Sequence, residues 1–403
     1  MSSIGSNGKP VPVLVVGAGP VGLAAAISLR EQGIHVRIVD EQTAEGKRTY
    51  PVILHPRTLR VLSGLGVSAA LEWRGRTVKR LAIHTDGQQQ ATLELPVAGQ
   101  MAGGALTLPQ DVLRQALMQR LCELGTEVEW KTRLVTLEQD LARVRVGLVR
   151  RERLPGQSYP PQSEWLDVGT EYVEAEFVVG ADGYNSSVRR LLGIEWVRMG
   201  KRQIYAFYDA PDPQAGDQAH LVLSDGLGSS TYPLQNGLSR LSFEIGVGTA
   251  HAPGATQLGQ LLASRMPWLG ADLHRVEWSG SAEFTPAVAD RFGEGGVWLA
   301  GDAAHSTGPL GAQSLNVGIH EAHDLAQRMA AQLERSGAAK FGVAYTTQRR
   351  LEWERLFGVG PSVPLTGCAP AWVGRHIAKL LPSLPAAGHD LDDLLDQLHV
   401  RSA

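Results

Sequence analysis

The first forty residues carry the pattern that most constrains the fold. A short, largely β-branched run, Val11–Val16, leads into GAGPVG at residues 17–22. Gly19–Gln32 is typical of a buried helix, Gly33 is placed to end it, and Val36–Asp40 is a second apolar run. Buried parallel strands are continuous apolar runs, and glycine commonly follows the end of a helix. The sequence therefore predicts a strand–helix–strand unit here, and with it an α/β fold.

The glycines between the first strand and the helix predict a nucleotide site. The first permits a tight turn, the second lets backbone approach a pyrophosphate, and the third allows close packing of helix on strand. An acidic residue at the end of the second strand, roughly 20 residues further on, can accept hydrogen bonds from ribose hydroxyls. The predicted nucleotide-binding residues here are Gly17, Gly19, Pro20, Gly22, Asp40 and Glu41. The motif does not separate FAD from NAD, and a glycine-rich packing turn is the alternative.

A second motif, GGVWLAGDAAHSTGPLGAQSLN, covers residues 295–316. Asp302 follows a predicted strand, where its carboxylate can accept a hydrogen bond from a ribityl hydroxyl. The loop at residues 308–312 leads directly into a predicted helix, whose N-terminus carries about half a positive charge. Such a helix end would stabilise an anionic reduced flavin. The alternative is an ordinary strand–loop–helix with a capping aspartate.

A third motif, VVGADGYNSSVR at residues 178–189, places Asp182 and Gly183 after a buried strand. Alone, it is equally typical of an ordinary strand-ending turn.

The remaining pattern predicts an interrupted first domain. Helices are predicted at Pro109–Leu124, Leu258–Met266, Leu315–Leu333, Trp372–Leu381 and Leu391–Leu398, and strands at Val128–Leu137, Leu141–Val149, Glu174–Val179 and Gly296–Ala300, with a hairpin loop at Leu154–Glu164. Between about Val197 and Glu283, short alternating segments predict an antiparallel sheet. We therefore predict a discontinuous nucleotide-binding domain (residues 1–72, 100–195 and 284–360), a β-sheet substrate domain (73–99 and 196–283) and a C-terminal helical segment (361–403).

Composition excludes several other classes. The net charge of -3, from 38 Lys+Arg against 41 Asp+Glu, argues against a nucleic-acid partner, which requires a basic surplus. Two distant cysteines, Cys122 and Cys368, predict reduced thiols and no metal site. Val11–Leu29 carries no charge but is broken by prolines and glycines, so we expect neither a leader nor a membrane span and predict a cytoplasmic protein.

Taken together, the three motifs resemble those of the single-component FAD-dependent aromatic hydroxylases, the family of p-hydroxybenzoate hydroxylase and the polyketide hydroxylases. The glycine fingerprint, the Ala181-Asp182-Gly183 turn and the Gly301-Asp302 motif match in order and spacing, roughly from Val11 to Arg355. The resemblance implies a Rossmann-like FAD-binding domain with the p-hydroxybenzoate hydroxylase fold. It also implies non-covalent FAD, reduction by NADH or NADPH, capture of O2 as a C4a-hydroperoxide, and oxygen transfer to an electron-rich aromatic small molecule. We expect a monomer or a homodimer.

The resemblance also implies roles for individual residues. Arg48 and Gln110 would contact the phosphate and ribose region, Asp182 would serve both FAD and nicotinamide binding, and Asp302 would bind the ribityl chain. Residues implied beside the isoalloxazine are Pro309, Gly311, Ala312, Leu315 and Asn316, with Gly301 in the preceding turn. Gly308 stands where the family usually has proline, Ser314 where it usually has glycine, and Gly296 where it commonly has arginine. The change to Ser314 is either harmless or alters flavin mobility and oxygen transfer.

The substrate side is less constrained. A base that deprotonates a phenol raises its nucleophilicity, and the candidates are Tyr205, Tyr208, His220, Tyr232 and His84; each is alternatively a half-buried strand residue. The predicted catalytic set is Pro309, Tyr208, His220 and Tyr232, and His305 is interpreted as structural. Apolar residues predicted to face inward, Phe207, Leu221, Leu223 and Phe243, favour a neutral substrate. Two alternatives stay open: an FAD-holding accessory or sensor protein, and a flavin-dependent halogenase, although no W-x-W-x-I-P segment is present.

Overall fold

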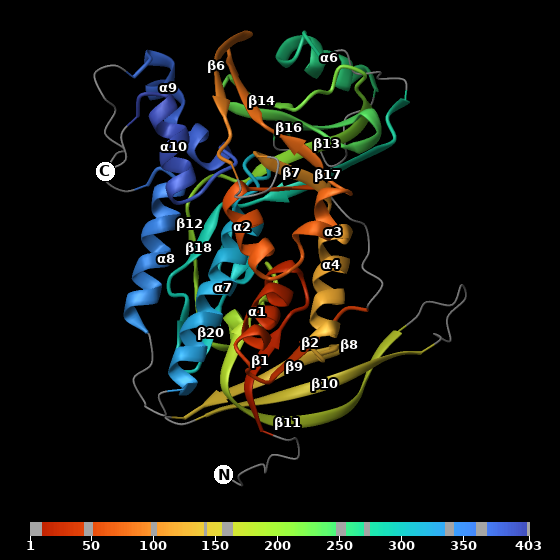
Figure 1. The fold of residues 1–403 in the computed structure, drawn as a ribbon, viewed down its shortest axis with the longest axis vertical. Helices are drawn as coiled ribbons and strands as arrows, with labels where there is room; N and C mark the ends of the chain where they lie inside the picture. Colours follow the sequence, from red (N-terminus) through yellow and green to blue (C-terminus); the bar gives the residue numbers. More distant parts are fainter. Residues whose placement is uncertain are drawn as a thin grey trace.

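A computed structural model describes residues 10–43, 51–97, 103–140, 143–154, 164–246, 255–269, 275–334, 342–359 and 369–400. Two large sheets lie at opposite ends of the molecule, with helices between them (Figure 1). Arg48, Cys368 and most of the predicted hairpin loop at 154–164 lie outside the described residues.

The first sheet contains the predicted strand–helix–strand unit. Its eight strands include the ordered path β19-β20-β11-β1-β2-β8, and β10 and β9 extend it from β11. The bounds are β1 Val11–Val16, β2 Val36–Asp40, β8 Val128–Trp130, β9 Thr132–Gln139, β10 Val144–Leu154, β11 Glu164–Gly180, β19 Gly293–Glu294 and β20 Val297–Leu299. The pairings of β20, β11, β1, β2 and β8 along this path are all parallel. Their carboxyl ends consequently share one edge of the sheet, where ligands commonly bind in such folds.

Three helices lie between the two sheets: α1 (Pro20–Glu31), α4 (Gln110–Glu123) and α7 (Gln313–Glu334). The first two agree with the predicted helices to within a residue at each end, and α7 begins two residues earlier than predicted. Helix α1 is buried along most of its length because the strands cover one side and α4 and α7 contact it on others.

The long hairpin differs from the prediction. The single strand expected at Val128–Leu137 is two strands, because Lys131 has a φ of 58° and turns the chain between them. Strand β8 pairs in parallel with β2, whereas β9 pairs antiparallel with β10. Strands β10 and β11 are both longer than the apolar runs that predicted them, because their antiparallel pairing continues through polar residues as far as Leu154 and Glu164.

The second sheet has seven strands in the order β17-β13-β16-β15-β14-β5-β6. Their bounds are β5 Arg80–Thr85, β6 Gln88–Glu94, β13 Gln203–Pro211, β14 Gln218–Ser224, β15 Leu227–Pro233, β16 Leu238–Ile245 and β17 Trp278–Phe284. Neighbouring strands pair antiparallel except β14 with β5. Helix α6 (Ala255–Arg265) lies on its outer side in Figure 1.

The two faces of this sheet have different neighbours because side chains alternate along a strand. The inner face, toward the first sheet, carries Phe207 and Tyr232 in the main core. The outer face packs Tyr208 and Phe243 with residues of α6 in a separate cluster.

Smaller elements connect the sheets. They are β3 Pro51–Leu54, β4 Arg76–Val78 and β7 Ala105–Pro109 in one three-stranded sheet, β12 Trp196–Arg198, β18 Ala287–Ala289 and β21 His305–Ser306 in another, and the helices α2 Pro56–Gly64, α3 Ser68–Glu72, α5 Ser187–Leu191, α8 Val343–Leu356, α9 Ala371–Leu380 and α10 His389–Gln397. Within the described ranges, no helix is both long and apolar enough to cross a membrane. The division into domains with the stated boundaries stays a prediction.

Candidate functional site

The glycine turn after β1 has no room for side chains. Gly17 has a φ of 103°, and a Cβ there would lie 2.2 Å from the Ala181 carbonyl oxygen at the end of β11. A Cβ on Gly22 would lie 1.9 Å from the Gly17 carbonyl oxygen. Gly19, by contrast, faces open space. The turn is therefore pressed against the sheet on one side and open on the other, beside the N-terminus of α1.

Two cavities meet at this turn and share the lining residues Gly19, Ala181 and Gly183. The smaller has a volume of about 240 Å³ and is also lined by Gly17, Asp40, Glu41 and Asp182. The larger, of about 400 Å³, extends toward the seven-stranded sheet. Together they form an elongated site with the glycine turn near its middle.

Carboxylates face the smaller cavity from two strand ends. The Oδ2 atom of Asp40 accepts a hydrogen bond from the Ala18 amide (2.6 Å), and its Oδ1 accepts one from the Gln42 amide (2.7 Å). Asp182 Oδ2 accepts from the amide of Ser187 at 2.6 Å. Its Oδ1 is buried without a hydrogen-bond partner, and burial raises the pKa of this carboxyl group.

Arg189 holds the Asp182–Gly183 turn in place. Its guanidinium donates to the carbonyl oxygens of Ala303 and Tyr184, each at 2.9 Å. It also lies 4.1 Å from the centre of the Trp196 ring. Through Ala303 the second and third motifs are directly connected.

The Gly301–Asp302 turn brings a carboxylate into the larger cavity. Gly301 has a φ of 63°, and its Cβ would lie 2.9 Å from Val21 of α1. Asp302 is accessible from the cavity. Because protein surrounds it on the other sides, desolvation raises its pKa, while His305 and a hydrogen bond from Ser314 act in the opposite direction.

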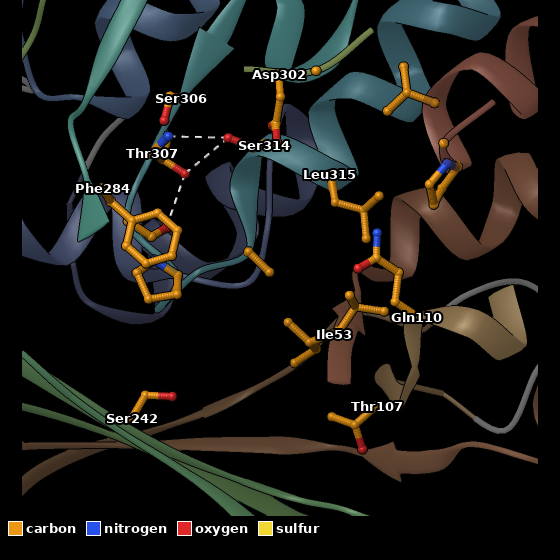
Figure 2. Close-up of a pocket in the computed structure, with 18 of the residues that line it drawn as sticks. Ile53, Thr107, Gln110, Ser242, Phe284, Asp302, Ser306, Thr307, Ser314 and Leu315 are labelled. Atoms are coloured by element: carbon orange, nitrogen blue, oxygen red, sulfur yellow. Dashed lines mark hydrogen bonds between the residues drawn. The ribbon is translucent and has the colours of Figure 1, made fainter. Parts of the chain in front are cut away.

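Ser314 takes part in the loop as well. Figure 2 shows its hydroxyl accepting a hydrogen bond from the Thr307 amide (3.2 Å) and lying 3.4 Å from the Thr307 hydroxyl. Ser314 thus connects the start of α7 to the segment before Pro309.

The loop before α7 has an inner and an outer layer. Pro309, Ala312 and Leu315 line the larger cavity, together with Ile53 and Gln110 from across it (Figure 2). Gly311 and Asn316 lie behind them and do not line it. These two are therefore supports of the loop.

The supports are hydrogen-bonded to distant segments. Asn316 is fully buried, accepts from the His55 amide and donates to the Ile53 carbonyl, both at 2.8 Å. The His55 Nε2–H donates to the Gly311 carbonyl at 2.8 Å, and burial lowers the pKa of His55 to about 4. Gln313 donates to the Leu384 and Ala386 carbonyls of the C-terminal segment. The loop is therefore held from both sides.

The opposite wall of the larger cavity comes from the seven-stranded sheet. Phe207, Phe284, Tyr232, Arg240 and Ser242 line it. The Tyr232 hydroxyl donates to the Leu310 carbonyl at 2.7 Å, and burial raises its pKa. The wall is thus largely aromatic.

Arg240 is the one cationic side chain among the described residues that line this cavity. Its Nε and Nη2 donate to the two carboxylate oxygens of Asp209 at 2.5 and 2.8 Å. The guanidinium also lies 4.6 Å from the centre of the Trp278 ring and 5.9 Å from that of Phe207. These contacts fix the orientation of the Arg240 guanidinium, and Nη1 is the nitrogen that Asp209 does not engage.

Two of the predicted catalytic residues lie elsewhere. Tyr208 and His220 are on the outer face of the sheet and do not line the cavity. His220 Nδ1 lies 3.0 Å from His84 Nε2, and the His84 ring stacks on Trp268 at 4.0 Å. Phe243, expected to face the substrate, also packs on this outer face. The prediction misplaced them because a strand's alternation does not say which face meets the site.

Sequence reasoning missed other lining residues. Arg240 carried a signal, since a lone arginine interrupts the apolar strand LSRLSFEI and Asp209 interrupts its neighbour. Ile53, Thr107 and Phe284 carried none that distinguishes them from ordinary strand residues.

The residues present suit FAD. A glycine turn open beside a helix N-terminus suits a pyrophosphate, and acidic acceptors stand on either side of it. Among the described residues, no group of three or more His, Cys, Asp or Glu side chains is arranged to hold a metal.

The comparison with known proteins defines the class. The model of the FAD binding domain family matches residues 10–357. The chain therefore belongs to this family, and FAD is its cofactor.

Curated relatives are monooxygenases. The chain is 28% identical over 326 residues to a 6-methylpretetramide 4-monooxygenase of Streptomyces rimosus, covering 79% of this chain and 55% of that protein. It is 26% identical over 328 residues to a rifampicin monooxygenase of Streptomyces venezuelae, covering 80% of this chain and 64% of the relative. This chain thus spans little more than half to about two thirds of their length.

Solved structures share the fold. The p-nitrophenol 4-monooxygenase PnpA of Pseudomonas putida superposes with a TM-score of 0.70 at 21% identity, over 98% of this chain and 100% of that one. Aklavinone-11 hydroxylase superposes with a TM-score of 0.61 at 24% identity, over 81% of this chain and 63% of that one. The predicted fold class is confirmed.

Proposed function

We propose that this protein is an FAD-dependent monooxygenase that inserts one oxygen atom from O2 into an electron-rich aromatic small molecule. The reaction consumes one NADH or NADPH and one proton and releases water with the oxygenated product. Relatives named as monooxygenases support this assignment. We place it in the cytoplasm, where reduced nicotinamide is available, as a monomer or a homodimer.

One observation carries the proposal. The larger cavity is lined on one side by residues of all three nucleotide-binding motifs and on the other by an aromatic wall. A flavin and an aromatic ring can therefore lie in the same cavity. Its volume of about 400 Å³ falls in the usual range for small-molecule sites.

The cofactor is held along the elongated site. Asp40 would bind the adenosine ribose, Gly19 would admit the pyrophosphate, and Asp302 would accept from the ribityl chain. Pro309, Ala312 and Leu315 would contact the isoalloxazine. When bound, FAD would supply the redox chemistry that the protein side chains lack.

The aromatic wall orients the substrate and excludes water. Phe207 and Phe284 contact the substrate ring, and their apolar surface keeps water away from the reacting atoms. The Tyr232 hydroxyl is engaged with Leu310, so its ring contributes packing and no base. Pro309 continues this wall toward the flavin.

The charged groups of the cavity indicate the substrate class. Among the described lining residues there is no histidine, lysine or glutamate, and Asp302 is the one carboxylate. With Asp302 assigned to FAD, the described lining residues offer no side chain to deprotonate a phenol. Arg240 instead offers Nη1 to an oxygen. We therefore assign aromatic substrates with an acidic hydroxyl, which arrive as the anion and bind to Arg240. This replaces the neutral substrate that the apolar strand residues favoured in the sequence.

The test is substrate-stimulated oxidation of NADH and NADPH by the FAD-loaded protein, with mass analysis of products. A panel should pair phenols of low pKa with matched phenols of ordinary pKa. We expect stimulation by the acidic members and a product heavier by one oxygen atom. Absence of any oxygenated product across polycyclic phenols, quinolones and indoles would contradict the proposed activity. Equal turnover of both members of each pair would contradict the substrate class alone.

A further inference from the structure

A buried carboxylate lies directly behind the Gly301–Asp302 turn. Glu321, in the middle of α7, is fully buried and does not line the cavity. It is not part of any motif found in the sequence. A buried charge is costly unless it is paired and hydrogen-bonded, so its partners indicate its role.

Glu321 accepts hydrogen bonds from donors on three segments. Its Oε2 accepts from the Gly301 amide at 2.9 Å and from His305 Nε2 at 2.7 Å. Its Oε1 accepts from the indole N–H of Trp353, on α8, at 3.0 Å. Because Gly301 adjoins Asp302, the first bond fixes the backbone from which the cavity carboxylate projects.

The surroundings keep Glu321 ionised. Burial alone would raise its pKa, but His305, Arg349 and the hydrogen bond from Trp353 outweigh this and lower it. The His305 ring is itself fully buried and stacks on Trp353 with 3.9 Å between ring centres. His305 is therefore enclosed behind the turn, where it does not reach the cavity.

Helix α7 is also unusually close to the turn. A Cβ on Gly318 would lie 2.8 Å from the Gly301 Cα. Gly318 precedes Glu321 by one helical turn, so both lie on the same face of α7. The helix thus contacts the turn through one backbone approach and one carboxylate.

We propose that Glu321 is a positioning residue for FAD, which holds the Gly301–Asp302 turn through the Gly301 amide and so aims the Asp302 carboxylate at the cofactor. His305 Nε2 donates to the same carboxylate oxygen as the Gly301 amide and so fixes the orientation of the Glu321 side chain. The inference rests on FAD binding and is independent of the proposed substrate.

The test variant is Glu321→Gln, which preserves shape. A carboxylate presents two acceptor oxygens, whereas an amide presents one acceptor and one NH2 group. The variant therefore sets an NH2 group either against the Gly301 amide and His305 or against the Trp353 indole. We expect the Kd for FAD, measured by fluorescence titration of the apoprotein, to rise at least about tenfold. The visible circular dichroism of bound FAD should also change. Glu334→Gln, an exposed site on the same helix, is the matched control and should leave both unchanged.

A double-mutant cycle with Asp302→Asn separates positioning from general stability. If Glu321 acts through Asp302, the two substitutions should raise the Kd for FAD less than multiplicatively. Multiplicative effects, or a lower thermal stability with a Kd within twofold of wild type, would overturn the proposal.

Should Glu321→Gln fail to fold, Glu321→Asp takes its place in the same cycle, because it keeps the charge but withdraws the carboxylate from the Gly301 amide by one methylene. Trp353→Phe alone leaves the Oε2 bonds in place and is expected to bind FAD within threefold of wild type. A tenfold loss in that variant would assign the role to α8 packing and would overturn the proposal.

Discussion

The cofactor side of the site and the sheet wall of the larger cavity are built in different ways. The cofactor side depends on close backbone approaches at Gly17, Gly22 and Gly301, where a Cβ would meet neighbouring atoms, and on carboxylates at strand ends. On the sheet wall, successive side chains along a strand point alternately toward the cavity and toward α6. A change on the cofactor side should therefore affect FAD itself, whereas a change on the sheet wall should affect the substrate or the fold.

The largest expected effect is the loss of FAD after a change on the cofactor side. Gly17→Ala places a Cβ 2.2 Å from the Ala181 carbonyl at a φ of 103°, a position that alanine cannot occupy without moving β11. We expect the purified protein to retain less than a tenth of the wild-type FAD, measured by absorbance after release. Gly64→Ala, at a site with nothing within 4 Å, is the control and should retain its FAD. Normal FAD content in Gly17→Ala would show that the close approach of Gly17 to Ala181 is not needed for FAD binding.

On the sheet wall, Arg240→Lys should affect the substrate and spare the cofactor. Lysine keeps the positive charge beside Asp209 but lacks the planar guanidinium, which pairs with Asp209 through two nitrogens and keeps Nη1 for a ligand. We expect kcat/KM for an acidic phenol to fall about tenfold or more, the loss of one charged hydrogen bond. The Kd for FAD should stay within twofold. Arg265→Lys, on the α6 side, should leave kcat/KM unchanged.

The outer face of the sheet should affect the pH dependence of folding stability. Burial, with a smaller contribution from His220, lowers the pKa of His84 to about 4 from an ordinary 6.5. The unfolded chain therefore binds a proton between these values that the folded protein does not. Stability is complete above pH 6.5 and falls as the pH drops toward 4, by up to about 3 kcal/mol for this group.

His84→Phe keeps a ring against Trp268 and removes that titration. Its melting temperature should decline less than that of wild type between pH 7 and pH 5. Parallel declines in the two proteins would show that folding does not lower the pKa of His84.

The smallest expected effect compares two tyrosines on opposite faces. Tyr232→Phe removes the hydroxyl that donates to the Leu310 carbonyl. Because one hydrogen bond to the loop before α7 is lost, kcat should fall by about threefold to tenfold. Tyr208→Phe should leave kcat and KM within twofold. Reversed results would restore the sequence-based choice of Tyr208 as a catalytic residue.

The sequence allowed more site residues to be predicted on the cofactor side than on the seven-stranded sheet. Gly17, Asp40, Asp182 and Asp302 follow buried strands in local patterns, and each lies at a cavity or at the turn between the two cavities. The family resemblance implied that Gly311 and Asn316 lie beside the isoalloxazine. In the structure they do not line the larger cavity and support the loop before α7 from behind. Arg48 lies outside the described residues.

What the sequence by itself determined is the local geometry of the three turns. A glycine needed at positive φ, or a carboxylate at the end of a strand, depends on neighbours a few residues away. Only the tertiary structure decided which face of β13 to β16 meets the loop before α7. A shift of one residue in strand register would place Tyr208 on the cavity face in place of Phe207. It also decided that Glu321, His305 and Trp353 meet behind Gly301. Those contacts join segments far apart along the chain, and no local pattern specifies them.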